Sequence, residues 1–194
     1  MKFQRISLIL VFAALALGGY VYYSESQKPP QVDEAKSDEK PLFNFKEQDV
    51  QAFTVQTPKQ TVAFEKSPNW TMRKPEVAAA DESSIAFLLN LLASGKSDRS
   101  FTVPAAKKSE FGLDQPSAIV DIKLSNQQNH RLVIGKPNFN RNFLYALVDP
   151  PTNQDLSVLL IPINFQNAVD RPLIEWKRDK PKPSPSASPS PSPQ

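Results

Sequence analysis

An uncharged stretch near the N-terminus, Ile6–Tyr23, constrains this chain more than any other part of its sequence. It follows Lys2 and Arg5, and no comparable apolar run occurs downstream. Its eighteen residues would form a helix of roughly 27 Å at about 1.5 Å per residue, close to the thickness of the hydrocarbon core of a bilayer. We therefore predict a single-pass transmembrane helix over Ile6–Tyr23, through which the chain contacts the membrane.

A cleaved signal peptide is the alternative interpretation of this stretch. Ala14–Ala16 fits an A-x-A cleavage site, but cleavage there leaves only about eight apolar residues before the site. Tyr20, Tyr22 and Tyr23 are instead typical of the aromatic belt at a membrane interface. We favour a retained anchor, and the positive charges before it predict a cytoplasmic N-terminus and an extracytoplasmic domain.

Composition divides the chain into five parts. Residues 1–5 are the predicted cytoplasmic N-terminus, and residues 6–23 are the anchor. Residues 24–41 are charged, contain prolines and have few large apolar side chains, so we expect a flexible linker. Residues 42–176 are long enough for one globular core, and residues 177–194 form a Pro/Ser-rich tail that we expect to be disordered.

The formal net charge of +3 comes from the two ends of the chain. Residues 1–5 and the tail together carry more positive charge than this total, so the remaining sequence is slightly acidic. No basic face for nucleic acid is therefore expected. The chain contains no cysteine, which excludes disulfides, thiolate metal sites and thiol catalysis.

Alternation of apolar and polar residues predicts short strands throughout the domain. The first three should form an antiparallel meander: Val50–Gln56, Thr61–Lys66 and Trp70–Arg73. Five more are predicted further along the chain, at Arg99–Val103, Ala118–Leu124, His130–Ile134, Phe143–Val148 and Leu156–Ile161. A turn is expected at Gly135–Asn138, between the third and fourth of these five.

One amphipathic helix is predicted over Glu82–Ala93, with Asp81 as its N-cap and Gly95, a residue that can adopt a positive φ, at its end. One helical turn is expected at Lys107–Phe111 and a short closing helix at Ile163–Val169. The predicted fold is α+β: mainly antiparallel sheet of about eight short strands, one packed amphipathic helix and the N-terminal transmembrane helix. A two-sheet, barrel-like arrangement is the alternative.

Several motifs follow one another in a recognisable order along residues 45–165. They are Trp70 before Pro75, the helix stripe Ile85, Leu88, Leu89 and Leu92, the element Phe111–Pro116 (FGLDQP), the strand Ile119–Leu124, the element Leu132–Gly135 (LVIG) and Tyr145. In this order they resemble the domain of unknown function 4340 family. The FGLDxP element followed by Ile-Gly is the most specific part of the resemblance.

The resemblance implies a bacterial, envelope-facing protein with an N-terminal membrane anchor. The family has no established enzymatic activity, so no catalytic residue carries over. The tail and the short linker are similar to those of cyanobacterial members, which implies either a bacterial inner membrane or a thylakoid membrane as the location. Some members resemble accessory parts of gliding or export transporter systems.

No catalytic, cofactor-binding or metal-binding residue is predicted. His130 is the only histidine, has no recognisable nucleophile or acid as a partner, and is expected in a surface turn. One histidine without any cysteine does not supply a zinc site. The five glycines lack the spacing of a phosphate-binding or dinucleotide-binding motif. The residues Phe111–Pro116 are interpreted as structural, with Gly112 in a left-handed conformation.

The most suggestive segment is a loop made of Asn138, Phe139, Asn140, Arg141 and Asn142. It combines an aromatic ring, a guanidinium group and three amides, which recur at binding surfaces. The competing interpretation is that Phe139 folds back on the core. We expect a non-enzymatic interaction or assembly module with a protein partner in or at the membrane, and this loop is the candidate for the partner contact. An exported protein that binds a small ligand or glycan, anchored or released, is the alternative.

Overall fold

The computed structural model describes residues 39–151 and 155–178. Its first strands form the predicted antiparallel meander, in which β2 (Val50–Gln56) pairs with β3 (Thr61–Lys66), and β3 with β4 (Trp70–Lys74). A further strand, β5 (Ala78–Ala79), pairs with β4. Because β5 has only two residues, it shows no alternation of apolar and polar positions, and the sequence did not predict it.

A second antiparallel meander follows later in the chain. It consists of β8 (Ala118–Leu124), β9 (Asn129–Pro137), β10 (Phe143–Val148) and β11 (Leu156–Pro162), with β7 (Arg99–Val103) paired to β11. The two meanders are joined where β2 pairs antiparallel with β8.

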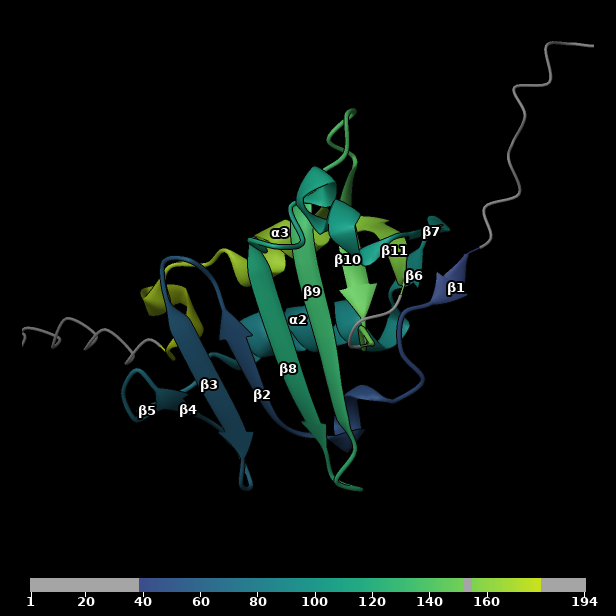
Figure 1. The fold of residues 1–194 in the computed structure, drawn as a ribbon. Coiled ribbons are helices and arrows are strands. Elements are labelled where there is room, and N and C mark those ends of the chain that lie inside the picture. The colour runs from purple at the N-terminus through teal and green to yellow at the C-terminus, as the bar shows by residue number, and fades with distance from the viewer. Residues whose placement is uncertain (1–38, 152–154, 179–194) are drawn as a thin grey trace, which may run out of the picture. The chain divides into compact units, whose positions relative to one another are not determined.

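The nine strands form one sheet in the order β5-β4-β3-β2-β8-β9-β10-β11-β7 (Figure 1). Both meanders run outward from the central pair β2 and β8. The predicted α+β fold with a mainly antiparallel sheet is confirmed, although the sheet has nine strands because β5 was missed. The described residues do not form the two-sheet alternative; beside the large sheet they contain a two-stranded ribbon of β1 (Lys40–Pro41) and β6 (Lys96–Ser97).

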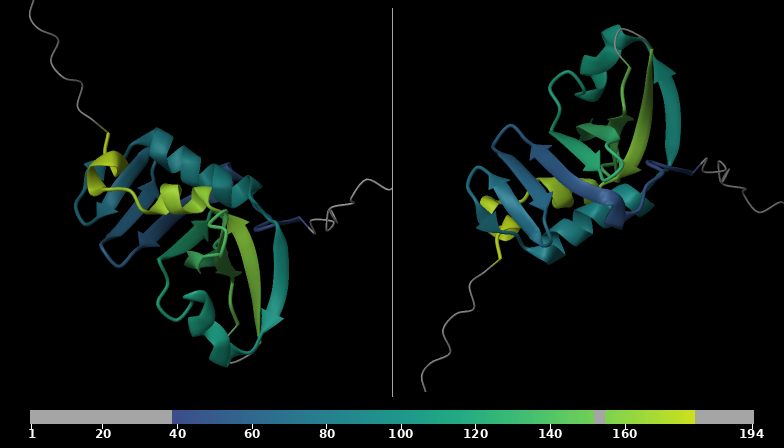
Figure 2. Two further views of the ribbon diagram at one scale, coloured as in Figure 1. Left: turned by 90° about the horizontal axis from the view of Figure 1, so that it is seen from above. Right: turned by 90° about the horizontal axis from the view of Figure 1, so that it is seen from below.

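The predicted amphipathic helix is α2 (Glu82–Ser94). It begins where expected because Asp81 caps it, and the Asp81 Oδ1 accepts a hydrogen bond from the Ser84 N–H at 2.8 Å. Its apolar stripe is buried: Ile85, Leu88, Leu89 and Leu92. The helix runs across one face of the sheet, and α3 (Asn164–Val169) lies on the same face (Figures 1 and 2).

Both faces of the sheet carry apolar clusters. The larger cluster lies between the sheet and the two helices, and its largest fully buried side chains are Trp176, Phe64 and Phe165. Three short 3₁₀ helices border the sheet: η1 (Glu47–Asp49), η2 (Ala105–Phe111) and η3 (Leu173–Trp176). The smaller cluster uses the opposite side chains of the second meander, packed with residues of η2 and β7: Phe101, Val103, Phe111, Leu113, Ile119, Val133, Tyr145, Leu147, Leu156 and Val158.

Two turn predictions were wrong in detail. Gly95 follows α2 at φ −63°, in an extended conformation, so the helix does not end through a left-handed glycine. The predicted turn at Gly135–Asn138 starts later, because β9 continues through Pro137 and the β9–β10 ladder accommodates a register shift between Leu144 and Ala146.

Among the residues that the structure describes, no helix has the length and apolar composition needed to cross a membrane. The predicted anchor Ile6–Tyr23 lies outside the described residues, as do most of the predicted linker and most of the predicted tail.

Candidate functional site

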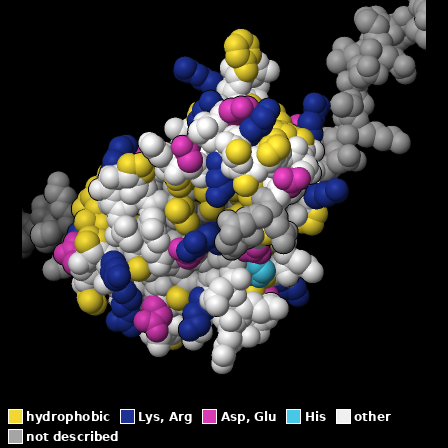
Figure 3. Space-filling view, in the orientation of Figure 1, with side chains coloured by type: hydrophobic (Ala, Val, Ile, Leu, Met, Phe, Trp, Pro, Cys, Tyr) yellow, Lys and Arg dark blue, Asp and Glu magenta, His cyan; other side chains and the backbone are white. Residues whose placement is uncertain are grey.

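The predicted contact loop, Asn138–Asn142, connects β9 to β10 at one end of the sheet (Figure 1). It projects beyond the strands and is visible at the edge of the space-filling view (Figure 3). Phe139 is 99% exposed, so the interpretation that its ring folds back on the core is wrong. Few side chains of this size expose an apolar ring so completely, because burial of a phenylalanine is favourable by about 2 kcal/mol.

The loop is held by its own hydrogen bonds rather than by burial. The Asn138 Oδ1 accepts from the backbone N–H groups of Asn142 and Phe143, both at 3.2 Å. The Arg141 N–H donates to the Asn138 carbonyl at 3.0 Å, and Arg141 has a φ of +57°. Asparagine at this position satisfies two backbone donors that an aliphatic residue would leave unpaired. The five residues thus form an ordered loop that presents Phe139 to solvent.

His130 occupies a different position from the one predicted. It lies in β9 and is half-buried against Phe43 and Phe45, with its ring centroid 5.3 and 5.6 Å from theirs. Its Nδ1 lies 2.7 Å from the Asp149 Oδ2. Within the described ranges no hydroxyl group hydrogen-bonds to His130. The pair fixes the segment that carries Phe43 and Phe45 against the sheet.

An open trough runs along the outer face of β2, β3 and β8, with a volume of about 610 Å³. The Arg131 Nε lies 2.6 Å from the Asp121 Oδ1 at one side of it, and the Arg73 Nε lies 3.0 Å from the Glu65 Oε2 at the other. The hydrogen bond and the charge of Asp121 raise the pKa of Arg131 above its usual range. Each of these two arginines is therefore neutralised by a carboxylate within the trough.

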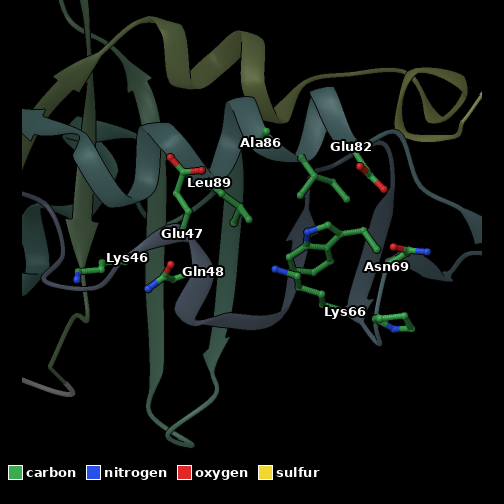
Figure 4. A pocket seen from close by; sticks show the side chains of 11 residues that line it. Lys46, Glu47, Gln48, Lys66, Asn69, Glu82, Ala86 and Leu89 are labelled. Atoms are coloured by element: carbon green, nitrogen blue, oxygen red, sulfur yellow. The ribbon is translucent and has the colours of Figure 1, made fainter.

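A second depression is a groove of about 640 Å³ between α2, η1 and the turn that joins β3 to β4. We call it the α2 groove. Its lining consists of Lys46, Glu47, Gln48, Lys66, Pro68, Asn69, Trp70, Glu82, Ile85, Ala86 and Leu89. Figure 4 shows Lys46, Glu47 and Gln48 toward one end and Lys66, Asn69 and Glu82 toward the other. Sequence reasoning missed this groove because its walls come from three segments with no shared local pattern.

The described part of the chain contains no cluster of side chains suited to bind a metal ion. No three histidine, aspartate or glutamate side chains gather there in a way that could hold an ion. The acidic groups of the α2 groove have partners of their own, since Glu82 pairs with Arg178 at 2.7 Å and Glu47 accepts from the Asn90 Nδ2 at 2.9 Å.

Comparison with known proteins gives one match. The family model described as Domain of unknown function (DUF4340) matches residues 70–188. The match begins at Trp70, later than the resemblance over residues 45–165 implied, and continues beyond its end. No protein with a curated description and no solved structure matches the chain.

Proposed function

Since this chain belongs to the DUF4340 family, we propose that it is a non-enzymatic interaction or assembly module tethered to a membrane by Ile6–Tyr23. The domain lies on the extracytoplasmic side, either of a bacterial inner membrane or of a cyanobacterial thylakoid membrane. The anchor and linker raise the concentration of the domain near membrane-embedded partners, which strengthens weak contacts without adding new ones.

The observation that carries this proposal is the complete exposure of Phe139 on a loop ordered by Asn138. Aromatic side chains dominate the binding energy of many protein interfaces when they enter a pocket on the partner. A loop that is ordered before binding loses little conformational entropy when it binds. Arg141 and the asparagine amides can supply the polar contacts around the buried ring.

Two measurements test this function on the full chain. Carbonate extraction should leave the protein at full length in the membrane pellet. Cleavage after Ala16 would instead release a form shortened by about sixteen residues. That result would contradict the retention of Ile6–Tyr23 as an anchor, but it would not test the role of the contact loop.

The second measurement is affinity purification from detergent-solubilised membranes, with the tag after residue 194. We expect one discrete membrane partner with the wild type and at least a tenfold lower recovery with Phe139→Ala. Val77→Ala is the matched control, because Val77 is also an exposed apolar side chain, at 73%, outside the loop. Equal recovery with both variants would contradict the role of the loop.

A further inference from the structure

We propose that the contact loop binds an acidic surface of its protein partner, on which carboxylates border the pocket that takes the Phe139 ring. This inference rests on the proposed function, since it names the chemistry of the partner at the same site. It follows from the positions of Lys136 and Arg141 on either side of Phe139 in the sequence, and from the charges of the segments that border the loop.

The chain around the loop carries positive charge and no acidic side chain. Between Asp121 and Asp149 the sequence contains no aspartate or glutamate, whereas a lysine precedes the loop and an arginine lies within it. These two residues, Lys136 and Arg141, are exposed, and neither forms an ion pair with any described residue. Both charges are therefore available to a partner.

Gly112 of the FGLDQP element makes room for the stem of Lys136. A Cβ at Gly112 would lie 3.2 Å from the Lys136 Cβ and 3.4 Å from its Cγ, so glycine leaves free the space that the lysine stem occupies. The residue as a whole is nevertheless exposed. The ammonium group thus extends from a packed stem at the base of the loop, which reduces the entropy that it loses when it pairs with a carboxylate.

The segment that packs against the base of the loop adds no excess charge. It consists of η2 and the turn after it. Lys107 and Glu110 form an ion pair at 3.9 Å. Lys108 and Asp114, the other charged residues of this segment, carry opposite charges that cancel.

The segment on the other side of the loop is also neutral. The Ile163 N–H donates to the Asn142 carbonyl at 3.1 Å, which places the start of α3 beside the loop. Residues 163–169 contain no charged side chain, and Asp170 after them pairs with Lys59 at 2.9 Å. Figure 3 shows Lys and Arg side chains on both sides of the projecting loop. The excess positive charge at this end of the sheet thus comes from the two cations that flank the ring.

A protein surface fits this arrangement better than a lipid surface does. Membrane binding strengthens with the apolar area that enters the bilayer, and Phe139 is the one large apolar side chain of the loop. The other exposed large apolar side chains of the described residues, Val77, Phe87 and Ile174, belong to other segments. A single ring between two cations is suited to one pocket with an acidic rim, because complementary charges speed association and fix its register.

Carbodiimide cross-linking in isolated membranes tests the proposal on the full chain, with a tag after residue 194. The reagent activates a carboxylate, the neutral Lys136 amine displaces the urea by-product with loss of a proton, and an amide bond joins the two side chains. We expect mass spectrometry to find Lys136 joined to an aspartate or glutamate of one membrane protein. Lys136→Arg should abolish this link but leave partner recovery unchanged, because arginine keeps the positive charge.

Lys123→Arg is the matched control for the cross-link. Lys123 is likewise an exposed lysine in a strand of the same sheet, β8, but it does not border the loop. Its replacement should leave the Lys136 link in place. Loss of the link in both variants would mean that it does not report on the loop, and would overturn the inference.

Charge reversal gives a second readout, the recovery of the partner in affinity purification. Lys136→Glu together with Arg141→Glu should lower recovery about tenfold or more, and Lys123→Glu should leave it unchanged. If recovery depends on Phe139 but not on these charges, and no Lys136 link forms, the inference fails while the proposed function stands. If the wild type recovers no partner, both fail.

Contact with lipid is tested with the full chain reconstituted in phosphatidylcholine vesicles, with or without phosphatidylglycerol. Phe139→Trp places an indole on the loop, and its fluorescence reports on the polarity around it. We expect the same emission maximum in both kinds of vesicle. A shift to shorter wavelength that requires phosphatidylglycerol would mean that the ring enters an anionic lipid surface, and would overturn the inference.

Discussion

Gly135 lies so close to Phe111 that a Cβ on the glycine would overlap the carbonyl oxygen of Phe111. The neighbouring residues Gly112 and Lys136 are also close: a Cβ on Gly112 would lie 3.0 Å from the backbone nitrogen of Lys136. The two most specific motifs of the sequence, FGLDQP and LVIG, therefore meet backbone to backbone. This contact supports the interpretation of FGLDQP as a structural element, because the two glycines allow η2 and β9 to pack without a side chain between them.

Substitution of Gly135 by alanine should lower the free energy of unfolding by about 2 kcal/mol or more, since the added methyl group forces the η2 and β9 backbones apart. Gly112→Ala should cost about 1–2 kcal/mol, because Gly112 has a φ of +67° in the left-handed region. Urea denaturation of the full chain in mild detergent measures both values. The two buried tryptophans, Trp70 and Trp176, report on unfolding of the domain. Unchanged midpoints would contradict the close packing.

The Asp149 carboxylate is expected to stabilise the packing of the segment that carries Phe43 and Phe45 against His130. One of its oxygens lies 2.7 Å from His130, the other accepts from the Arg131 N–H at 2.6 Å, and Asp149 has a φ of +43°. Asp149→Ala should therefore reduce the free energy of unfolding by about 1–2 kcal/mol. Asp149→Asn should reduce it less, because asparagine tolerates a positive φ and keeps an acceptor for Arg131. Equal stability of the alanine variant and the wild type in urea denaturation would argue against this role.

The N-terminus of α2 supplies a third test. Asp81→Ala removes the acceptor of the Ser84 N–H and should lower the free energy of unfolding by about 1 kcal/mol. Ser83→Ala is the control in the same helical turn, since the Ser83 side chain makes no hydrogen bond to the described residues. Thermal unfolding followed by circular dichroism should show a lower midpoint for Asp81→Ala alone. A similar loss in both variants would point to a general effect on the first turn.

Phe139→Ala should leave the stability of the domain unchanged, because an almost fully exposed ring buries no area against the core. The same urea denaturation measures this directly. A loss of more than about 1 kcal/mol would mean that the ring packs on the domain in solution, at odds with its exposure here. Unchanged stability would allow any lost binding to be assigned to the contact itself.

The strands with clear alternation were predicted almost residue by residue. Val50–Gln56, Thr61–Lys66 and Ala118–Leu124 have the predicted bounds. The second and third bury alternate side chains, and the first does so beyond a register shift between Val50 and Ala52. The prediction ended β9 too early at Ile134 because Gly135 and Pro137 are typical of turns. Contact with Phe111 explains the glycine within the strand, and such a tertiary contact leaves no trace in local patterning.

The order of the strands could not be predicted in the same way. Hairpin-length connections indicate which neighbours pair, but the pairing of β2 with β8 joins segments that are separated along the chain by α2 and by the strands β3 to β7. The α2 groove depends on this arrangement, since Lys46, Trp70 and Ala86 come together only in the folded domain. The loop Asn138–Asn142 could be proposed from sequence as a contact site because its residues are consecutive, although only the structure shows the exposure of Phe139.

The most direct test of the proposed function is site-specific photo-crosslinking in intact membranes. A photoreactive phenylalanine analogue replaces Phe139 in the full chain, and a second variant carries it at Asn126, in the β8–β9 turn at the opposite end of the strands. A membrane-tethered interaction module predicts one discrete adduct with a membrane protein from position 139 and none from position 126. No adduct at position 139, or the same adducts from both positions, would contradict it.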